Sequence, residues 1–138
     1  MIIYKGKFFN RIIIIRVFKY SHCSVECLVH ALIYIDRLIQ SGTINVNSLT
    51  IHRIIITSVV LAIKYFDDFF YTDNQYARIG GIEVEELCFL EIEFLKYINF
   101  SLYVSCEDYQ KYHNELYLHV SNGLCPLCSK IYCYYSLC

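Results

Sequence analysis

The stretch from Leu49 to Phe66, LTIHRIIITSVVLAIKYF, decides the fold of this chain. It contains no Gly or Pro and is long enough for about five helical turns, and Asn47 and Ser48 are placed to cap its first amides. At about 100° per residue its main polar side chains share one stripe, formed by Thr50, Arg53, Thr57 and Lys64. Nearly all other positions are apolar, and such a helix is buried by other helices. We therefore predict a helical domain with this segment as its axis and only the stripe facing outward.

Two further helices are predicted before this axis. The segment Asn10–Tyr20, NRIIIIRVFKY, is amphipathic, and its four consecutive Ile residues would also suit a strand. We predict a helix, because the rest of the chain offers no strand partners. The second helix begins at Ser21 or Ser24 and runs to about Gln40, where Ser41-Gly42 provides a C-terminal stop.

The chain after the axis is predicted to hold an aromatic loop and further helices. The loop is Asp67–Asn74, DDFFYTDN, and Asn74–Ile79 is a short helical segment that Gly80-Gly81 breaks. The remaining helices are Glu83–Ile98 and Ser105–Val120, with acidic residues near their starts. The predicted fold class is all-α, a bundle of about five helices around a buried central helix.

The sequence divides into three parts. Residues 1–10 form a divergent N-terminal segment, residues 11–120 form the helical domain, and residues 121–138 form a tail rich in Cys and Tyr. The four thiols of the tail belong to Cys125, Cys128, Cys133 and Cys138. Four thiols are enough for tetrahedral zinc, but their spacing matches no zinc finger, so we predict no metal site and keep an apolar tail as the preferred interpretation.

Length and composition limit the function classes. A chain of 138 residues is one domain. Hydrophobic residues make up 57 %, yet the longest uncharged apolar run of the axis, Ile54–Ile63, is only about half of a membrane span. A net charge of −1 gives no electrostatic basis for binding nucleic acid. We therefore expect neither a membrane segment nor a nucleic-acid partner.

Cysteine usage and the absence of catalytic motifs limit the function classes further. Cys23, Cys27 and Cys88 fall in helical patterns, where cysteine behaves as a small hydrophobe, so we expect an intracellular chain with reduced thiols. The sequence contains no Gly-rich phosphate loop, no HExxH and no nucleophile elbow, and its five His residues are scattered. We expect no enzyme activity, no cofactor and no small-molecule substrate.

Three charged residues do not fit the amphipathic pattern. Asp36 and Glu91 lie at the centres of apolar helix faces, and Lys64 ends the central stripe. An unpaired buried carboxylate is costly, so each acid needs a partner. Two explanations remain open, namely an internal ion pair or a charge at a surface that another protein completes.

Several stretches of the sequence resemble the cyclin family. Ala31–Leu38, ALIYIDRL, resembles the signature of the cyclin box, and His52–Tyr65 resembles its central helix, which carries the family's lysine near its end. Tyr76–Ile82, YARIGGI, is similar to the pattern of P/U-type cyclins, the type of the yeast phosphate-response cyclin. We assign its double glycine, Gly80-Gly81, a structural role. Because the resemblance covers about Arg16–Leu116, residues 11–120 are interpreted as a single cyclin box.

The resemblance implies roles for the three anomalous charges. Lys64 and Glu91 match the lysine and glutamate with which cyclins hold a cyclin-dependent kinase, through hydrogen bonds to kinase backbone beside its αC helix. Asp36 matches the cyclin-box aspartate, which in many cyclins pairs with a first-helix arginine. Arg11 or Arg16 is the candidate for that arginine, and a structural role is preferred for Asp36.

The resemblance also implies a function, that of a regulatory subunit which binds and activates a cyclin-dependent protein kinase in the nucleus, the cytoplasm or both. Phe69, Phe70 and Tyr76, together with Tyr71, would supply hydrophobic docking surface or equally close the core. The alternatives are a cyclin-fold adaptor that does not activate a kinase and a small zinc-binding helical protein. A cyclin-fold transcription factor is disfavoured by the single repeat and the net charge of −1.

Overall fold

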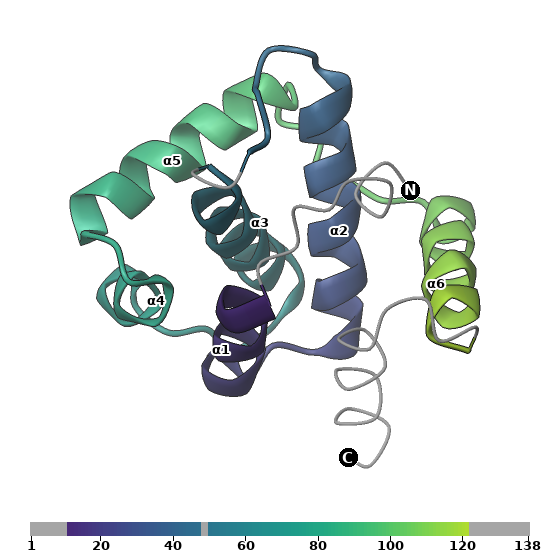
Figure 1. The fold of residues 1–138 in the computed structure, drawn as a ribbon, viewed down its shortest axis with the longest axis horizontal. Coiled ribbons are helices and arrows are strands. Elements are labelled where there is room, and N and C mark those ends of the chain that lie inside the picture. The colour runs from purple at the N-terminus through teal and green to yellow at the C-terminus, as the bar shows by residue number, and fades with distance from the viewer. Residues whose placement is uncertain (1–10, 48–49, 122–138) are drawn as a thin grey trace.

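The computed structural model describes residues 11–47 and 50–121, and this part of the chain consists of six helices joined by loops (Figure 1). The helices are α1 (Arg11–Ser21), α2 (Val25–Gln40), α3 (Ile51–Phe66), α4 (Asp73–Gly80), α5 (Val84–Tyr97) and α6 (Cys106–Ser121). The all-α class is confirmed, and α4 is the element that takes the number beyond about five. Residues 1–10, 48–49 and 122–138, the last with the four candidate zinc ligands of the tail, lie outside the described residues.

Helix α3 is the axis of the bundle. It is enclosed by α1, α2, α4 and α5, whereas α6 lies on the far side of α2 (Figure 1). Eleven of its 16 residues are buried. Each fully buried Val, Leu or Ile side chain contributes about 1.5–3 kcal/mol, so this one helix supplies much of the driving force for folding.

Only part of the predicted polar stripe reaches the surface. Thr57 is 1 % exposed, so the expectation that it faces solvent is wrong. Helix α5 packs over this side of α3, and the Thr57 hydroxyl donates a hydrogen bond to the Arg53 carbonyl at 2.6 Å. That local bond allows the hydroxyl to be buried without losing a partner. Arg53 itself is exposed and forms an ion pair with Glu86 of α5.

The start of α3 also differs from the prediction. Thr50 is the N-cap residue, and its side chain makes no capping hydrogen bond. The Asn47 Oδ1 accepts a hydrogen bond from the Thr50 amide at 3.1 Å. Asn47 therefore closes the turn before the helix with its side chain, and its carbonyl accepts a hydrogen bond from the Ile51 amide at 3.0 Å.

Helix α4 is short and is fixed at both ends. Thr72 and Gln75 form a reciprocal capping box at its start. Gly81 ends it with a φ of 70°, a left-handed conformation that favours glycine. Gly80 lies against α3, where an added Cβ would be 2.7 Å from Cγ1 of Ile56. Gly81 is thus favoured by its backbone conformation, and Gly80 by the close approach of α4 to α3.

Asp36 is 1 % exposed and faces α6. The Tyr112 hydroxyl donates a hydrogen bond to the Asp36 carboxylate, and burial together with this bond raises the pKa of that hydroxyl. Arg16, one of its two candidate partners, donates a hydrogen bond to the Arg78 carbonyl at 3.2 Å. The side chain of Arg11, the other candidate, lies outside the described part of the chain. The deep position of Asp36 supports a structural role at the α2–α6 contact.

Candidate functional site

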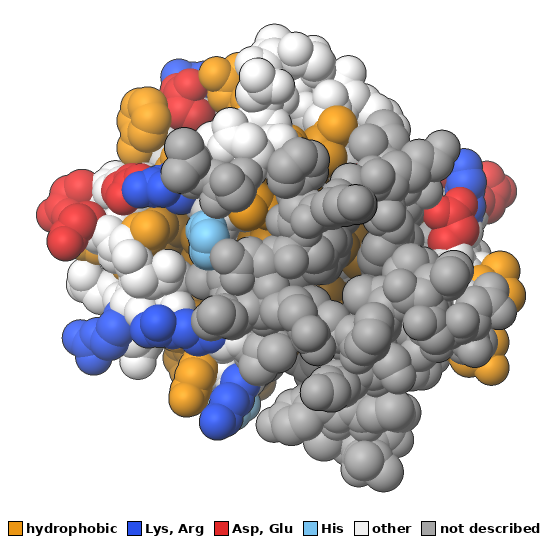
Figure 2. All heavy atoms as spheres, viewed as in Figure 1, with side chains coloured by type: hydrophobic (Ala, Val, Ile, Leu, Met, Phe, Trp, Pro, Cys, Tyr) orange, Lys and Arg blue, Asp and Glu red, His pale blue; other side chains and the backbone are white. Residues whose placement is uncertain are grey.

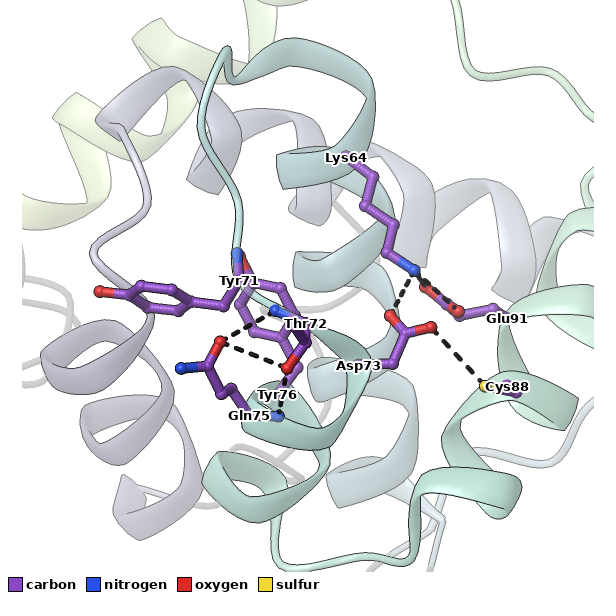
Figure 3. A network of polar contacts seen from close by, with 8 residues as sticks. All are labelled: Lys64, Tyr71, Thr72, Asp73, Gln75, Tyr76, Cys88 and Glu91. Atoms are coloured by element: carbon purple, nitrogen blue, oxygen red, sulfur yellow. Dashed lines mark hydrogen bonds and ion pairs between the residues drawn. The ribbon is translucent and has the colours of Figure 1, made fainter.

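Lys64, Asp73 and Glu91 form a charged cluster, here called the lysine network, where three helices meet. Lys64 lies in the last turn of α3, Asp73 is the first residue of α4, and Glu91 lies in the middle of α5. The Lys64 Nζ is 2.5 Å from Oδ1 of Asp73 and 2.9 Å from Oε1 of Glu91 (Figure 3). A cation at a helix C-terminus and an anion at a helix N-terminus both suit the helix dipoles. The network therefore ties α4 and α5 to the end of α3.

The lysine network is only partly accessible to solvent. Side-chain exposure is 29 % for Lys64 and 11 % for Glu91. Burial raises the pKa of Glu91, and its bonds to Lys64 offset only part of this rise. Burial by itself lowers the pKa of Lys64, but hydrogen bonds with Asp73 and Glu91 outweigh it and leave the pKa above its usual value. At neutral pH the lysine is therefore held as an ammonium ion between two carboxyl groups.

Sequence reasoning found two members of this network and missed the third. The sequence predicts a loop at Asp73, whereas the structure places it in the first turn of α4, after the Thr72-x-x-Gln75 pattern that marks a helix start. The Cys88 Sγ lies 3.7 Å from Oδ2 of Asp73 (Figure 3). The donor atoms of Asp73, Cys88 and Glu91 lie within 4.8 Å of one another. The Lys64 ammonium already bridges the two carboxylates, so a protein cation supplies the charge that a metal would bring.

The loop between Lys64 and Asp73 of the lysine network carries exposed aromatic side chains. Phe69 is 91 % exposed and Phe70 is 57 % exposed, both in the loop that joins α3 to α4. Tyr76 differs, because it is 1 % exposed and its hydroxyl accepts a hydrogen bond from the Tyr71 amide at 3.0 Å. Of the two roles considered for these aromatics, Tyr76 therefore closes the core. Phe69 and Phe70 form exposed apolar surface instead.

Helix α5 adds apolar surface that sequence reasoning did not single out. Phe89 and Ile92 lie one turn apart on the helix that carries Glu91, and both are more than half exposed. Exposed large apolar side chains of this kind are more frequent where proteins bind one another. The described part of the chain is thus an all-helical bundle with exposed apolar side chains on α5 and in the loop between α3 and α4.

Comparison with known proteins agrees with this class. The family model described as cyclin matches residues 6–102, a range that includes Lys64, Asp73 and Glu91. The chain belongs to the cyclin family. Members of this family are regulatory subunits without catalytic activity of their own.

Individual relatives define the branch of the family. The chain is 45 % identical over 101 residues to cyclin-P3-1 of Oryza sativa subsp. japonica, covering 73 % of this chain and 43 % of that protein. It is 40 % identical over 102 residues to cyclin-U4-1 of Arabidopsis thaliana, covering 73 % and 50 %. It is 38 % identical over 114 residues to PHO85 cyclin-7 of Saccharomyces cerevisiae, covering 74 % and 40 %. The chain thus spans half or less of the length of these relatives, and the expected P/U type is confirmed.

A helix that crosses a membrane needs about 20 consecutive, mostly apolar residues. None of the helices within residues 11–47 and 50–121 has both the length and the apolar character required to cross a bilayer.

Proposed function

We propose that this chain binds a cyclin-dependent protein kinase and activates it. The observation that carries the proposal is the lysine network, held at an edge beside exposed Phe69 and Phe70. Similarity to PHO85 cyclin-7 favours a kinase of the cyclin-dependent type as the partner. We expect this partner in the nucleus or the cytoplasm, as the family resemblance implies.

The geometry of the lysine network suits recognition of kinase backbone. An ammonium group has three N–H donors, and two of those of Lys64 point to Asp73 and Glu91. One donor remains for a backbone carbonyl of the kinase, and Glu91 keeps acceptor capacity for a backbone N–H. Because both side chains are already held in place, little side-chain entropy is lost when the kinase binds.

Activation follows from where such a bundle would bind. A protein kinase is active when the glutamate of its αC helix pairs with the lysine that holds the ATP phosphates. A cyclin bound beside αC favours the active position of that helix and so shifts an existing equilibrium. The apolar surface of Phe69, Phe70, Phe89 and Ile92 would provide the contact area. The chain itself performs no chemical step.

Recovery of a kinase with the tagged chain from its source organism, followed by an activity assay, tests this proposal. The recovered kinase is expected to phosphorylate a general substrate protein faster when the purified chain is added. Recovery of no cyclin-dependent kinase would contradict the proposal. A kinase that binds without any gain in activity would indicate the adaptor function instead.

A further inference from the structure

The outer side of α5 carries a row of exposed side chains, here called the α5 stripe. Its members are Glu85, Phe89, Ile92 and Lys96, and of the other α5 residues only Tyr97 is exposed. At about 100° per residue the four members fall within about 60° of one another. Phe89 is 61 % exposed and Ile92 is 53 % exposed. Figure 2 shows hydrophobic side chains beside charged ones along the upper left edge of the molecule, over α5.

The α5 stripe faces away from the bundle. Helix α5 packs on α3 and α4 with its opposite side, where Leu87 and Phe94 are buried. In Figure 1, α5 forms an edge of the bundle, and no other described helix lies beyond it. Glu91 lies roughly 130° around the helix from the middle of the stripe. The stripe is therefore a different surface from the lysine network.

The spacing of the α5 stripe is that of a contact between helices. Its members are separated by four, three and four positions. This is the spacing of the apolar seam along which two helices of a coiled coil meet. The occupant that suits the stripe is therefore a second helix.

The order of its side chains makes the stripe complementary to a copy of itself. An acid, Glu85, lies at one end, a base, Lys96, lies at the other, and the two apolar residues lie between them. The pairs Glu85/Lys96 and Phe89/Ile92 share one midpoint along the helix. When two such helices lie antiparallel, each Glu85 is opposite a Lys96 and each Phe89 is opposite an Ile92. This is the self-complementarity that a two-fold symmetric contact requires.

The charges next to the stripe do not oppose this pairing. Glu86 and Glu93 flank it on one side, and each already has a cation, Arg53 for Glu86 and Lys96 for Glu93. The exposed Lys96–Glu93 pair is of a weak kind, so Lys96 remains able to bind an acid of a neighbouring chain. Glu85 has no hydrogen bond or ion pair among the described residues.

We propose that the α5 stripe binds a second copy of this chain, with the two α5 helices side by side and antiparallel. One pair of helices buries less than a standard interface of about 1,600 Å², so the dissociation constant is expected in the micromolar range. The dimer does not rest on the proposed kinase binding, because the stripe and the lysine network share no residue. The kinase contact proposed above uses the same Phe89 and Ile92, so the chain would pair with itself only while it is free of kinase.

Sedimentation equilibrium of the whole chain, kept reduced so that no disulfide links two copies, tests this proposal. Between about 5 and 200 µM the mean mass is expected to rise from that of a monomer towards that of a dimer. Ile92→Glu should weaken dimerisation at least about tenfold, because symmetry places the substitution in the contact twice. The control, Leu118→Glu, changes a similarly exposed residue of α6 and should alter the dissociation constant less than about twofold. A chain that stays monomeric throughout, or equal weakening in both variants, would overturn the proposal.

Exchange of charges tests the antiparallel arrangement. Glu85→Lys gives a stripe with two lysines and Lys96→Glu gives one with two glutamates, so each variant should dimerise at least about fivefold more weakly at low salt. Circular dichroism checks that both variants are folded. An equimolar mixture is expected to form a heterodimer at least as stable as the original dimer, because every lysine then meets a glutamate. A mixture of the folded variants that associates no better than either one alone would contradict the antiparallel pairing.

The dimer and the kinase complex can be tested separately. Lys64→Ala with Glu91→Ala, the variant expected to lose affinity for the kinase, keeps the α5 stripe. It should dimerise within about twofold of the unmodified chain, because the substituted residues lie on a different surface. If the folded variant no longer dimerised, the contact would lie at the lysine network and the proposal would be overturned.

Discussion

At the scale of single residues, Glu91 carries a cost of burial that its bonds to Lys64 offset only in part. Burial raises the pKa of Glu91 even though Lys64 is hydrogen-bonded to it. A raised pKa means that folding disfavours the ionised form of this carboxyl group. Ionised Glu91 therefore does not add to the free energy of unfolding at neutral pH. The same network raises the pKa of Lys64, so it favours the charged form of the lysine.

Gly80 is a residue whose steric role can be tested directly. On helix propensity alone, Gly80→Ala would stabilise α4 by about 1 kcal/mol. The added Cβ would lie 2.7 Å from Cγ1 of Ile56, so we expect instead a destabilisation of about 1–3 kcal/mol by overpacking. Urea unfolding measures the difference. Gly81→Ala is the comparison, because an added Cβ there meets no atom within 4 Å and only the φ of +70° is strained. A more stable Gly80→Ala protein would contradict the close packing of α4 on α3.

Cys27 predicts a loss of stability at alkaline pH. It is fully buried, its Sγ donates to the Ala62 carbonyl at 3.6 Å, and burial raises its pKa from 9.0 to about 12. Below pH 9 both folded and unfolded states keep the proton, so stability is unaffected. Between pH 9 and about 12 only the unfolded state releases it, and stability falls by about 1.4 kcal/mol per pH unit.

Urea unfolding at about pH 8 and at about pH 10.5 measures this loss. The control is Cys27→Ala, which is less stable at the lower pH because it leaves a small cavity. Its stability is expected to fall less steeply with pH than that of the unmodified chain. Equal slopes for the two proteins would show that Cys27 does not titrate as its burial requires.

At the scale of secondary structure, α4 is the short helix that positions Asp73 in the lysine network. Eight residues are too few for an isolated helix to be stable in water. The capping box of Thr72 and Gln75, the left-handed Gly81 and the packing of Gly80 on α3 supply the missing stability. The placement of Asp73 beside Lys64 therefore depends on the cap that precedes it.

Removal of this cap is expected to weaken the protein measurably. Thr72→Ala should lower the free energy of unfolding by about 1 kcal/mol, since the Gln75 amide loses its side-chain acceptor. Thr72→Ser keeps a hydroxyl and should lie within about 0.5 kcal/mol of the unmodified chain. Chemical denaturation of the three proteins distinguishes the cap from simple loss of side-chain volume. Similar losses in both variants would argue against the capping box.

The sequence was sufficient for some elements and not for others. The buried axis could be predicted because α3 is apolar almost all round, and the cyclin pattern identified Lys64 and Glu91. The burial of Thr57 could not be predicted, because it depends on how α5 crosses α3. Asp73 was missed because the aromatic residues before Thr72 suggested a longer loop. Tyr76 could not be assigned to core or surface, since both environments favour tyrosine.

At the scale of the whole molecule, the structure separates two surfaces of different charge. The lysine network contains two carboxyl groups for one lysine, and exposed phenylalanines lie in the loop between Lys64 and Asp73. A groove between α1 and α4 is lined by Arg16 and Arg78 together with Tyr20 and Tyr71. Helix α6 contacts the rest of the bundle mainly through α2, with Tyr112 on Asp36. It lies beyond residues 6–102, the part that matches the cyclin family, so both surfaces are built largely from the shared domain.

The affinity of the kinase for a Lys64→Ala, Glu91→Ala double variant tests the central claim most directly. The kinase is the one recovered with the unmodified chain, and circular dichroism checks that the variant is folded. The control is Arg53→Ala with Glu86→Ala, which removes another ion pair between α3 and α5. We predict that the first variant loses at least about 2 kcal/mol of binding free energy, roughly 30-fold in affinity, and that the control loses less than about 1 kcal/mol. Undiminished affinity of the folded Lys64→Ala, Glu91→Ala protein would contradict the account.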